Sequence, residues 1–411
     1  MTALGVFLGY RLKTQCSTRE RVLAGWQWSH NCYSDIVGLY DARKPEFRRP
    51  GYKPFAAHGL AYRDNNLEYP ALTGLFISAV NAGVEPGDGE GFLRANALWL
   101  GVAAAAGGAA LAAATRRPKR ILLYALSPAM ISYALHNWDL LPVALTAAAL
   151  WTFSRRWDAA AGVALGLGAA AKLYPGFLVP VLLLACLAEP DATRGRWRAA
   201  WLAAGSVAGF SVPNLIVLAY AGFDGWVFPW RMQSLRGPNP ETHWFILRHQ
   251  LDHTGLGSGT WLLGRGWARI SQAASVLAFL GSSALLLRAE VRRERFRPVV
   301  ACFGVAILFL LTAKVYSPQY ALWLLPFFVV VRVPWHGFAA FAVADMFALG
   351  AVWSFYFHHS TFGGSPWIIL QVAVVARYAA LGYLLWLTRG RSEEILAESF
   401  HANRSTVVQT A

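Results

Sequence analysis

Residues 92–114 read FLRANALWLGVAAAAGGAALAAA, and the basic run RRPKR follows at 116–120. The apolar stretch is long enough to cross a bilayer as one helix, which takes about 20 predominantly apolar residues. Arg and Lys residues directly after such a stretch are typical of the cytoplasmic end of a membrane helix. This part of the sequence therefore predicts a membrane-spanning helix whose C-terminal end lies in the cytoplasm.

The same pattern recurs along the chain. Of the 411 residues, 56% are hydrophobic and 14% are charged, whereas ordinary soluble domains have about 45–50% and 25%. We therefore predict an all-α polytopic membrane protein with about twelve transmembrane helices in one domain, 1–411. The predicted spans are 1–10, 92–114, 121–135, 139–153, 158–173, 175–188, 198–220, 268–287, 298–314, 318–331, 335–356 and 366–388. The first is too short to cross and lacks signal-peptide features, so we expect translation to start upstream of Met1.

The net charge of +15 follows from the orientation that these spans predict. Basic clusters come after every second span, and Arg and Lys in short loops are retained in the cytoplasm. The clusters lie at 116–120, 155–156, 194–198 and 288–297, and further basic residues lie in a predicted cytoplasmic tail, 389–411. The opposite side receives long loops at 11–91 and 221–267 and short ones at 136–139, 314–319 and 358–365. We expect a bacterial plasma-membrane protein with its functional residues on the extracytoplasmic side, and no nucleic-acid partner.

The first outer loop has further features. Residues 69–83 are apolar but too few to cross, so we interpret them as an interfacial or re-entrant helix. Cys16 and Cys32 share this loop, where an oxidising compartment permits a disulfide, although two cysteines alone do not define a disulfide framework. Cys186 and Cys302 lie in predicted spans, where we expect them to be inert packing residues.

No cofactor motif is present. The Gly-rich run Gly166–Lys172 lacks the spacing of a phosphate-binding loop, and small residues in a membrane helix indicate close helix packing. No His-Glu-x-x-His motif occurs. We therefore predict no cofactor and no metal site, and leave dependence on a divalent metal open.

The outer ends of the spans carry the polar residues on which function can depend. Asp35 follows Tyr33 in the first outer loop and is suited to act as a general base; the alternative is a cap for a helix that starts at Ile36. Glu68 precedes Tyr69-Pro70, where the simplest role is an acidic residue at the start of the interfacial helix. Asn137-Trp138-Asp139 can bind a sugar through hydrogen bonds, or cap the helix that starts at Leu140.

Two Lys-x-Tyr elements lie where one span ends and the next begins with proline. Lys172 precedes Tyr174-Pro175, and Lys314 precedes Tyr316-Ser317-Pro318. An ammonium group and free backbone amides at a helix start would suit a lipid phosphate, whereas each lysine alone could extend to the interface. The recurrence on one side favours a phosphate-binding cleft.

Two further pairs of charged residues lie outside the Lys-x-Tyr elements. Arg231 and Arg236 lie in the second long loop, followed by His243, and can bind phosphate through two parallel hydrogen bonds. Asp345 and Arg377 lie at similar depth in consecutive antiparallel spans, so each is the expected partner of the other.

The order of these outer motifs resembles that of the GT-C membrane glycosyltransferases. The motifs are Asp35 in a large first loop, Glu68-Tyr69-Pro70, Asn137-Trp138-Asp139, Lys172-Leu173-Tyr174-Pro175, Arg231–Gly237 and Ser317-Pro318-Gln319-Tyr320. More narrowly, the chain resembles actinobacterial glycosyltransferase family 87, which includes polyprenyl-phosphate-mannose-dependent alpha-mannosyltransferases. The resemblance extends from Cys16 to Arg389 and implies a GT-C-like helical bundle with a large first extracytoplasmic loop.

The resemblance also implies roles and partners. Asp35 would be the catalytic base of an inverting transfer, and Lys172, Arg231, Arg236 and Lys314 would neutralise the donor phosphate. A polyprenyl-phosphate donor requires neither a nucleotide-binding fold nor a metal that bridges a diphosphate. The acceptor would be a cell-envelope glycolipid or glycan, and mannose the expected sugar. The implied substrate-binding residues are Tyr33, Glu68, Asn137, Asp139, Tyr174, His243, Ser317, Gln319 and Tyr320.

Two other classes of protein remain as alternatives. A transporter or flippase of lipid-linked sugars would also need cationic outer residues, but transporters often have paired repeats with polar residues at mid-membrane. Here no internal repeat is evident, and the polar residues gather on one side. A basic membrane scaffold leaves the Lys-x-Tyr elements unexplained.

Overall fold

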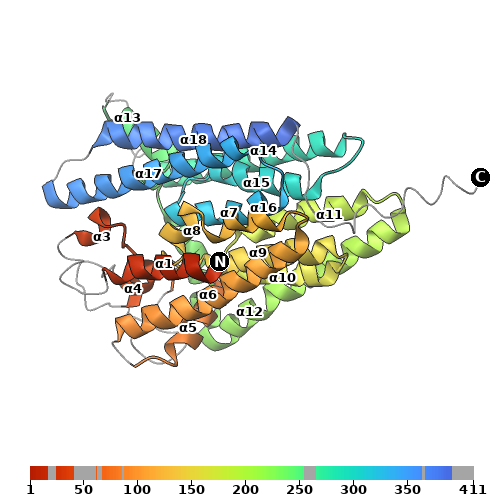
Figure 1. The fold of residues 1–411 in the computed structure, drawn as a ribbon, viewed down its shortest axis with the longest axis horizontal. Helices are drawn as coiled ribbons and strands as arrows, with labels where there is room; N and C mark the ends of the chain where they lie inside the picture. The colour runs from red at the N-terminus through yellow and green to blue at the C-terminus, as the bar shows by residue number, and fades with distance from the viewer. Residues whose placement is uncertain are drawn as a thin grey trace, which may run out of the picture.

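The computed structural model describes residues 1–16, 25–40, 62, 67–85, 88–253, 265–362 and 366–390. These residues form an elongated bundle of helices that run along a common direction (Figure 1), and no β-strand occurs among them. The predicted all-helical fold class is therefore confirmed.

The helices follow the predicted spans closely. The first part of the chain contains α1 (Thr2–Thr14), α3 (Trp26–Ser29), α4 (Asp35–Tyr40), α5 (Ala71–Asn81), α6 (Gly89–Ala114), η2 (Pro118–Ile121), α7 (Leu122–Ala125), α8 (Pro128–Tyr133), α9 (Leu140–Ser154) and α10 (Asp158–Ala171). The second part contains η3 (Tyr174–Leu178), α11 (Val179–Leu187), α12 (Ala192–Leu235), α13 (His243–His253), α14 (Arg265–Val291), α15 (Pro298–Thr312), η5 (Pro318–Leu324), α16 (Leu325–Val330), α17 (Trp335–Phe362) and α18 (Trp367–Gly390). Each predicted span corresponds to one helix or to a run of short consecutive helices. The segment predicted to be interfacial or re-entrant is the helix α5.

Helix length supports fewer membrane crossings than the sequence predicts. Among the described residues, 5 helices are long and apolar enough to span a membrane. They are Gly89–Ala114, Ala192–Leu235, Gly266–Val291, Trp335–His359 and Trp367–Arg389. Six further apolar helices have 10–17 residues, below the roughly 20 that a straight crossing requires. The five long apolar helices indicate a multi-pass membrane protein. The count of about twelve crossings stays a prediction.

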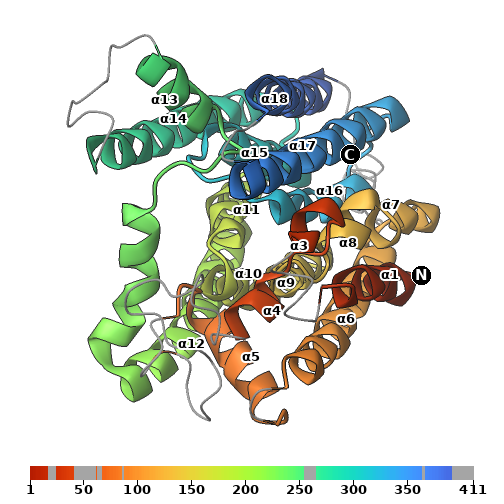
Figure 2. The same cartoon turned by 90° about the vertical axis from the view of Figure 1, so that its left-hand side faces the viewer.

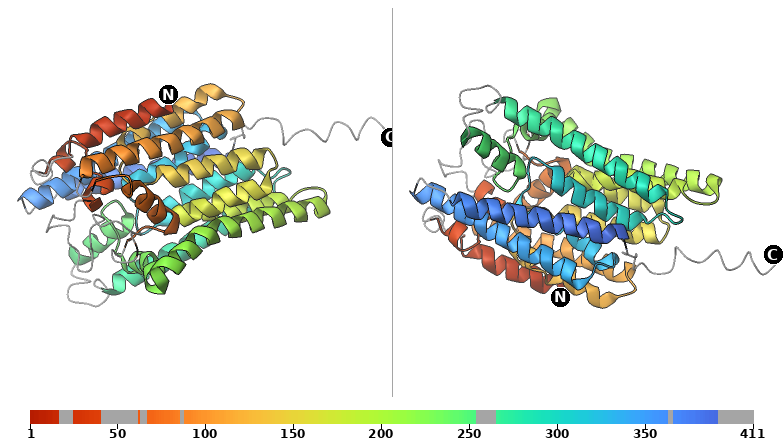
Figure 3. Two further views of the ribbon diagram at one scale, coloured as in Figure 1. Left: turned by 90° about the horizontal axis from the view of Figure 1, so that it is seen from below. Right: turned by 90° about the horizontal axis from the view of Figure 1, so that it is seen from above.

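The connections between helices divide between the two ends of the bundle. The basic connections between α9 and α10, α11 and α12, and α14 and α15 lie at the right-hand end of Figure 1, opposite α3, α4 and α13. Figure 3 shows the same division from two other sides of the bundle. Figure 2 looks onto the end with α3, α4 and α13, where α3 lies between α4 and α17. The predicted outer motifs thus share one end of the molecule.

Glycines bring α10 and α12 into close backbone contact. A Cβ atom added at Gly166 would clash with the backbone of Ser206, and one added at Gly205 would clash with the backbone of Ala159. The Gly-rich run therefore packs helices together, as the sequence predicts.

The second long outer loop differs from its prediction. The helix that was expected to end near residue 220 continues to Leu235, with a break at Gly222, whose φ of 71° and ψ of 179° are not helical. Only glycine adopts this conformation at little cost, so the chain changes direction there and resumes as a helix. Together with α13, this makes much of the 221–267 segment helical.

Candidate active site

Contacts on both sides of Asp35 fix its position at the start of α4. Cys16, two residues after α1, forms a disulfide with Cys32, with a Cα–Cα distance of 5.6 Å. Ser34 donates to the carbonyl oxygen of Leu135 at 2.6 Å, and the Asp35 backbone amide donates to that of His136 at 2.7 Å. The segment before α4 is thereby attached to α1 and to the turn between α8 and α9.

Two tyrosine hydroxyls hold the Asp35 carboxylate. Tyr33 donates to its Oδ1 at 2.6 Å and Tyr69 donates to its Oδ2 at 2.8 Å. Burial, and then the charge of Asp35, raise the pKa of both tyrosines well above the usual range, so both keep their protons. Asp35 itself is half-buried. Helix α4 begins at Asp35 rather than Ile36, and the two carboxylate oxygens face the tyrosines.

Asp139 and Lys172 form a pair next to this carboxylate. The Lys172 Nζ lies 3.4 Å from Asp139 Oδ2, and the indole nitrogen of Trp323 donates to Asp139 Oδ1 at 2.8 Å. Asn137 accepts from the Asp139 backbone amide at 3.0 Å. Asp139 precedes α9 without a side-chain cap, so the capping alternative is wrong for Asp139. Its carboxylate instead holds a lysine from the end of α10.

The Lys172 ammonium lies over the ring of a tyrosine, Tyr69, that also contacts Asp35. Its Nζ lies 5.5 Å from the centroid of the Tyr69 ring and 5.3 Å from that of Tyr320, distances at which cation–π attraction operates. Tyr69 is also a donor to Asp35, and the charge of Asp35 acts on Lys172. One tyrosine thus contacts the proposed base with its hydroxyl and a cation with its ring.

Arg236, which caps the C-terminal end of α12, is a second cation at this site. Burial acts to lower the pKa of Arg236, but the charges of Glu68, Tyr320 and Asp35 outweigh it and raise that pKa. Glu68 is not the cap of α5, because Pro70 occupies that position. It contributes negative charge beside Arg236 instead.

Lys314 and Arg231 have other partners. The buried Lys314 Nζ donates to the carbonyl oxygens of Ser234 at 3.1 Å and Ala268 at 3.5 Å, although it lies close enough to Arg236 for their charges to interact. Arg231 is 61% exposed and forms its ion pair, within the described part of the chain, with Asp224 at 3.5 Å. The structure therefore brings Lys172 and Arg236 to Asp35, and leaves Arg231 on the surface.

The other predicted substrate-binding residues lie in η3, η5 and α13 or directly before η5. Tyr320 and Tyr174 both stack on Trp323, with centroid distances of 3.9 Å and 4.4 Å. The Tyr320 ring also contacts Lys172, and the buried Tyr174 hydroxyl accepts a hydrogen bond from Thr146. Ser317 precedes η5, and Gln319 is buried in its first turn, where its Oε1 has no hydrogen-bond partner among the described residues. His243 starts α13 and packs against Tyr378 with a centroid distance of 5.2 Å.

The predicted pairing of Asp345 with Arg377 is confirmed. Both side chains are buried, with Arg377 Nη1 3.8 Å from Asp345 Oδ1. Tyr133 donates to Asp345 at 3.0 Å, and Arg377 donates to the backbone oxygen of Glu241 at 2.7 Å. Burial raises the pKa of the Glu241 carboxyl to about 7, and Arg377 opposes that shift.

Sequence reasoning missed Lys13, His136 and Trp323. Lys13 is fully buried near the end of α1, donates to the backbone oxygen of Asn31 at 3.0 Å, and interacts with the charge of Asp35. Burial, and then the charges of Lys13 and Lys172, lower the pKa of His136 well below its usual range. The one available signal for Lys13 was its place three residues before Cys16.

Chemically, the site combines a fixed carboxylate with two cations, Lys172 and Arg236, whose charges interact with it. A carboxylate can take a proton from a hydroxyl group, and cations can stabilise an anionic leaving group. Among the described residues, no group of three or more His, Cys, Asp or Glu side chains is arranged to hold a metal ion.

Comparison with known proteins assigns a family to this arrangement. The model of glycosyltransferase family 87 matches residues 66–313, which is more than half of the chain. The matched region contains Glu68, Asp139, Lys172 and Arg236, while Asp35 and Lys314 lie outside it. No curated protein sequence matches the chain.

Proposed function

Because this chain belongs to glycosyltransferase family 87 and is therefore a membrane glycosyltransferase, we propose that it transfers a sugar from a polyprenyl phosphate to a cell-envelope glycolipid or glycan. Mannose is the sugar that we propose, and the extracytoplasmic face of the plasma membrane is the proposed place of transfer. The Asp35 carboxylate beside Lys172 and Arg236 is the observation that carries this proposal.

In the proposed reaction, an acceptor hydroxyl oxygen attacks the anomeric carbon of the donor sugar. Its proton passes to a carboxylate oxygen of Asp35, while the bond between the anomeric carbon and the phosphate oxygen breaks. The bonding electron pair leaves with the polyprenyl phosphate, and the configuration at the anomeric carbon inverts. The hydrogen bonds from Tyr33 and Tyr69 support this role because they hold the carboxylate in one orientation before the acceptor binds.

The leaving group needs positive charge. Lys172 and Arg236 are the cations that we propose for the donor phosphate, since the charge of Asp35 acts on both. Lys314 would also bind the phosphate if its ammonium group gave up its hydrogen bonds to the two carbonyl oxygens. Arg231 would have to leave Asp224, so we assign it the weakest contribution.

The test is the substitution Asp35→Asn, assayed with purified protein, a polyprenyl-phosphate mannose donor and an envelope lipid extract. Loss of the general base should lower kcat by about 10²–10⁴-fold. Asp252→Asn is the matched control, because the Asp252 side chain is 48% exposed and its ion-pair partner, Arg248, has no role in the proposed reaction. Undiminished transfer by Asp35→Asn would remove Asp35 from the role of base. Absence of transfer by the unsubstituted protein, with any such donor, would favour a transporter of lipid-linked sugars.

A further inference from the structure

A cavity of about 510 Å³ is lined by residues that include neither Asp35 nor the two tyrosines that donate to it. It is formed where α3 and the segment after it face α8 and α17, at the end of the bundle that carries the candidate active site. Its volume falls within the roughly 300–1,000 Å³ of small-molecule binding sites. Neither the proposed base nor the proposed cations line it.

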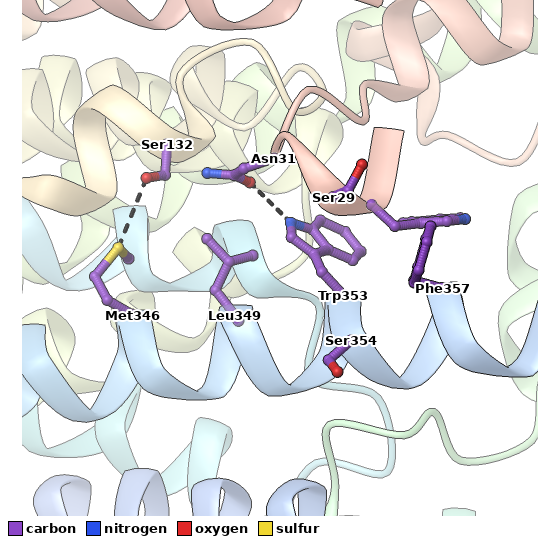
Figure 4. A pocket seen from close by; sticks show the side chains of 10 residues that line it. Ser29, Asn31, Ser132, Met346, Leu349, Trp353, Ser354 and Phe357 are labelled. Atoms are coloured by element: carbon purple, nitrogen blue, oxygen red, sulfur yellow. Dashed lines mark hydrogen bonds between the residues drawn. The ribbon is translucent and has the colours of Figure 1, made fainter. Parts of the chain in front are cut away.

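Aromatic rings form one side of this cavity. Trp28 and Trp353 both line it, with ring centroids 4.9 Å apart, and Phe357 lies one turn beyond Trp353 on α17. Figure 4 shows Trp353 and Phe357 projecting from α17 on the side that faces Ser29. Trp28 is itself stacked on Tyr33 and Tyr356, so the rings form a fixed apolar wall against which the apolar face of a sugar can pack.

Small polar groups interrupt the apolar lining. Ser29, Asn31, Ser132 and Ser354 supply hydroxyl and amide groups that can bind the hydroxyls of a ligand. The Asn31 Oδ1 accepts from the indole nitrogen of Trp353 at 2.8 Å, and its backbone oxygen accepts from Lys13 at 3.0 Å. In Figure 4 the amide nitrogen of Asn31 points away from Trp353, toward Ser132. Asn31 is therefore held so that it can donate along the cavity.

The lining of this cavity differs in charge from the proposed donor site. None of the described residues that line it is charged. A phosphate would need cations, which are found around Asp35 instead, at Lys172 and Arg236. An acyl chain would favour an unbroken apolar surface, and the polar groups interrupt that surface. The lining thus fits an uncharged molecule that has both hydroxyl groups and apolar faces.

One aromatic stack connects the cavity to the proposed base. Trp28 stacks on Tyr33 with a centroid distance of 5.0 Å and an interplanar angle of 16°, and Tyr33 donates to Asp35 at 2.6 Å. Two stacked rings, those of Trp28 and Tyr33, therefore connect a sugar in the cavity to the carboxylate. Such a sugar would be the neighbour of the acceptor residue whose hydroxyl reacts.

We propose that this cavity binds a neutral sugar of the acceptor, adjacent to the residue that receives the transferred group. The assignment to the acceptor rests on the proposed function, whereas binding of a neutral sugar in the cavity does not. The two statements can therefore be tested separately.

Gly350 provides a direct way to fill the cavity. It lines the cavity on α17, and a Cβ atom added there would have no heavy atom within 4 Å. Gly350→Leu should therefore occupy the cavity without a clash. Gly382→Leu is the matched control, because Gly382 lies inside α18, also has open space around an added Cβ, and does not line the cavity.

The first measurement is direct binding, with the full-length protein in lipid nanodiscs and no donor present. The probes are methyl α-mannopyranoside and methyl α-glucopyranoside, observed by saturation-transfer-difference NMR. We expect saturation of sugar-ring protons with the unsubstituted protein, Gly382→Leu and Asp35→Asn, and at least a fivefold loss with Gly350→Leu. Equal signals from both glycine variants, or no signal from the unsubstituted protein, would overturn the proposal. A co-purified lipid that mass spectrometry finds missing only from Gly350→Leu would also overturn it, in favour of an acyl chain.

The second measurement tests assignment to the acceptor. Under the transfer assay, Gly350→Leu should raise the KM for the acceptor at least fivefold and leave the KM for the donor unchanged. A changed donor KM with an unchanged acceptor KM would reject the acceptor assignment. If no donor supports transfer, the proposed function fails, and the binding measurement still decides whether the cavity holds a neutral sugar.

Discussion

At the scale of single residues, the Asp35 carboxylate depends on the two tyrosines that donate to it. Tyr69 also contacts Lys172 with its ring, so Tyr69→Phe removes a hydrogen bond while it keeps the aromatic surface. A hydrogen bond to a charged group contributes about 1.5–3 kcal/mol, and about 1.4 kcal/mol corresponds to a tenfold change in rate. We predict that Tyr69→Phe lowers kcat by roughly ten- to hundredfold.

The control for this measurement is Tyr220→Phe, because Tyr220 is 65% exposed. Its kcat should equal that of the unsubstituted protein. A kcat for Tyr69→Phe that matches the control would mean that Tyr33 alone positions the carboxylate.

Lys13 should make the stability of the protein depend on pH. Burial lowers its pKa from 10.5 to about 7, and the charge of Asp35 opposes that shift. Because the unfolded chain then holds more protons than the folded one between these values, the free energy of unfolding rises with pH across this window. We predict that the melting temperature increases between pH 7 and pH 9 more in the unsubstituted protein than in Lys13→Met. Parallel pH profiles for the two proteins would contradict this assignment.

The sequence indicated some residues of the candidate site and not others. Asp35 could be selected because it follows Tyr33 in the first outer loop, and Lys172 because the Lys-x-Tyr element recurs at the outer end of a second span. Lys13 and Trp323 could not, because one contacts Asn31 and the other contacts Asp139 only after distant helices have packed. Arg231 and Arg236 are equivalent by sequence alone. In the structure, the end of α12 leaves Arg231 exposed, whereas the charge of Glu68 acts on Arg236.

At the scale of elements, the Cys16–Cys32 disulfide joins the end of α1 to the segment before Asp35. Closing a loop of this size stabilises a fold by about 3 kcal/mol. We predict that the oxidised protein, once denatured, exposes the 2 free thiols, Cys186 and Cys302, and that reduction adds Cys16 and Cys32. Reduction of the folded protein should lower both its melting temperature and its kcat. Equal thiol counts before and after reduction would show that the bond does not form.

The contact between α10 and α12 depends on glycine. A side chain at Gly166 meets the backbone of Ser206, which cannot move without distorting α12. Overpacking of a tight interface costs about 1–3 kcal/mol, and we predict the upper end of this range for Gly166→Leu. The measurement is the thermal stability of the purified protein, with Gly382→Leu as the control. If both variants melt together, the two helices can separate at little cost.

The ends of helices could be predicted from the sequence where a charged residue or a proline interrupts the apolar run. The starts of η3 and η5 beside Pro175 and Pro318 are examples. The continuation of α12 past Gly222 was not predictable, because the segment that follows mixes apolar and polar residues without a clear period. Helix length agreed with the short predicted spans, such as 139–153 and 298–314, whereas α12 and α14 are longer than the spans predicted for them.

At the scale of the whole molecule, charge placement predicts which ends of the helices lie together, because Arg and Lys are retained on one side of the membrane. It does not predict which helices are neighbours. Arg377 on α18 binds the backbone of Glu241, 136 positions away in sequence, and no local pattern encodes that contact. The sequence therefore indicated the face that carries the site, while packing determines which outer residues meet at Asp35.

The orientation of the whole molecule can be tested with single cysteines at opposite ends of the bundle. Arg231 is 61% exposed near the end of α12, on the side predicted to be outside, and Arg155 is exposed at the end of α9, within a basic cluster predicted to be cytoplasmic. We predict that a membrane-impermeant maleimide labels Arg231→Cys in intact cells, and labels Arg155→Cys only after permeabilisation. The unsubstituted protein is the control, because Cys186 and Cys302 are buried and Cys16 and Cys32 are bonded to each other. Labelling of Arg155→Cys in intact cells would reverse the orientation and move Asp35 to the cytoplasmic face, where the transfer would have to draw on a cytoplasmic acceptor.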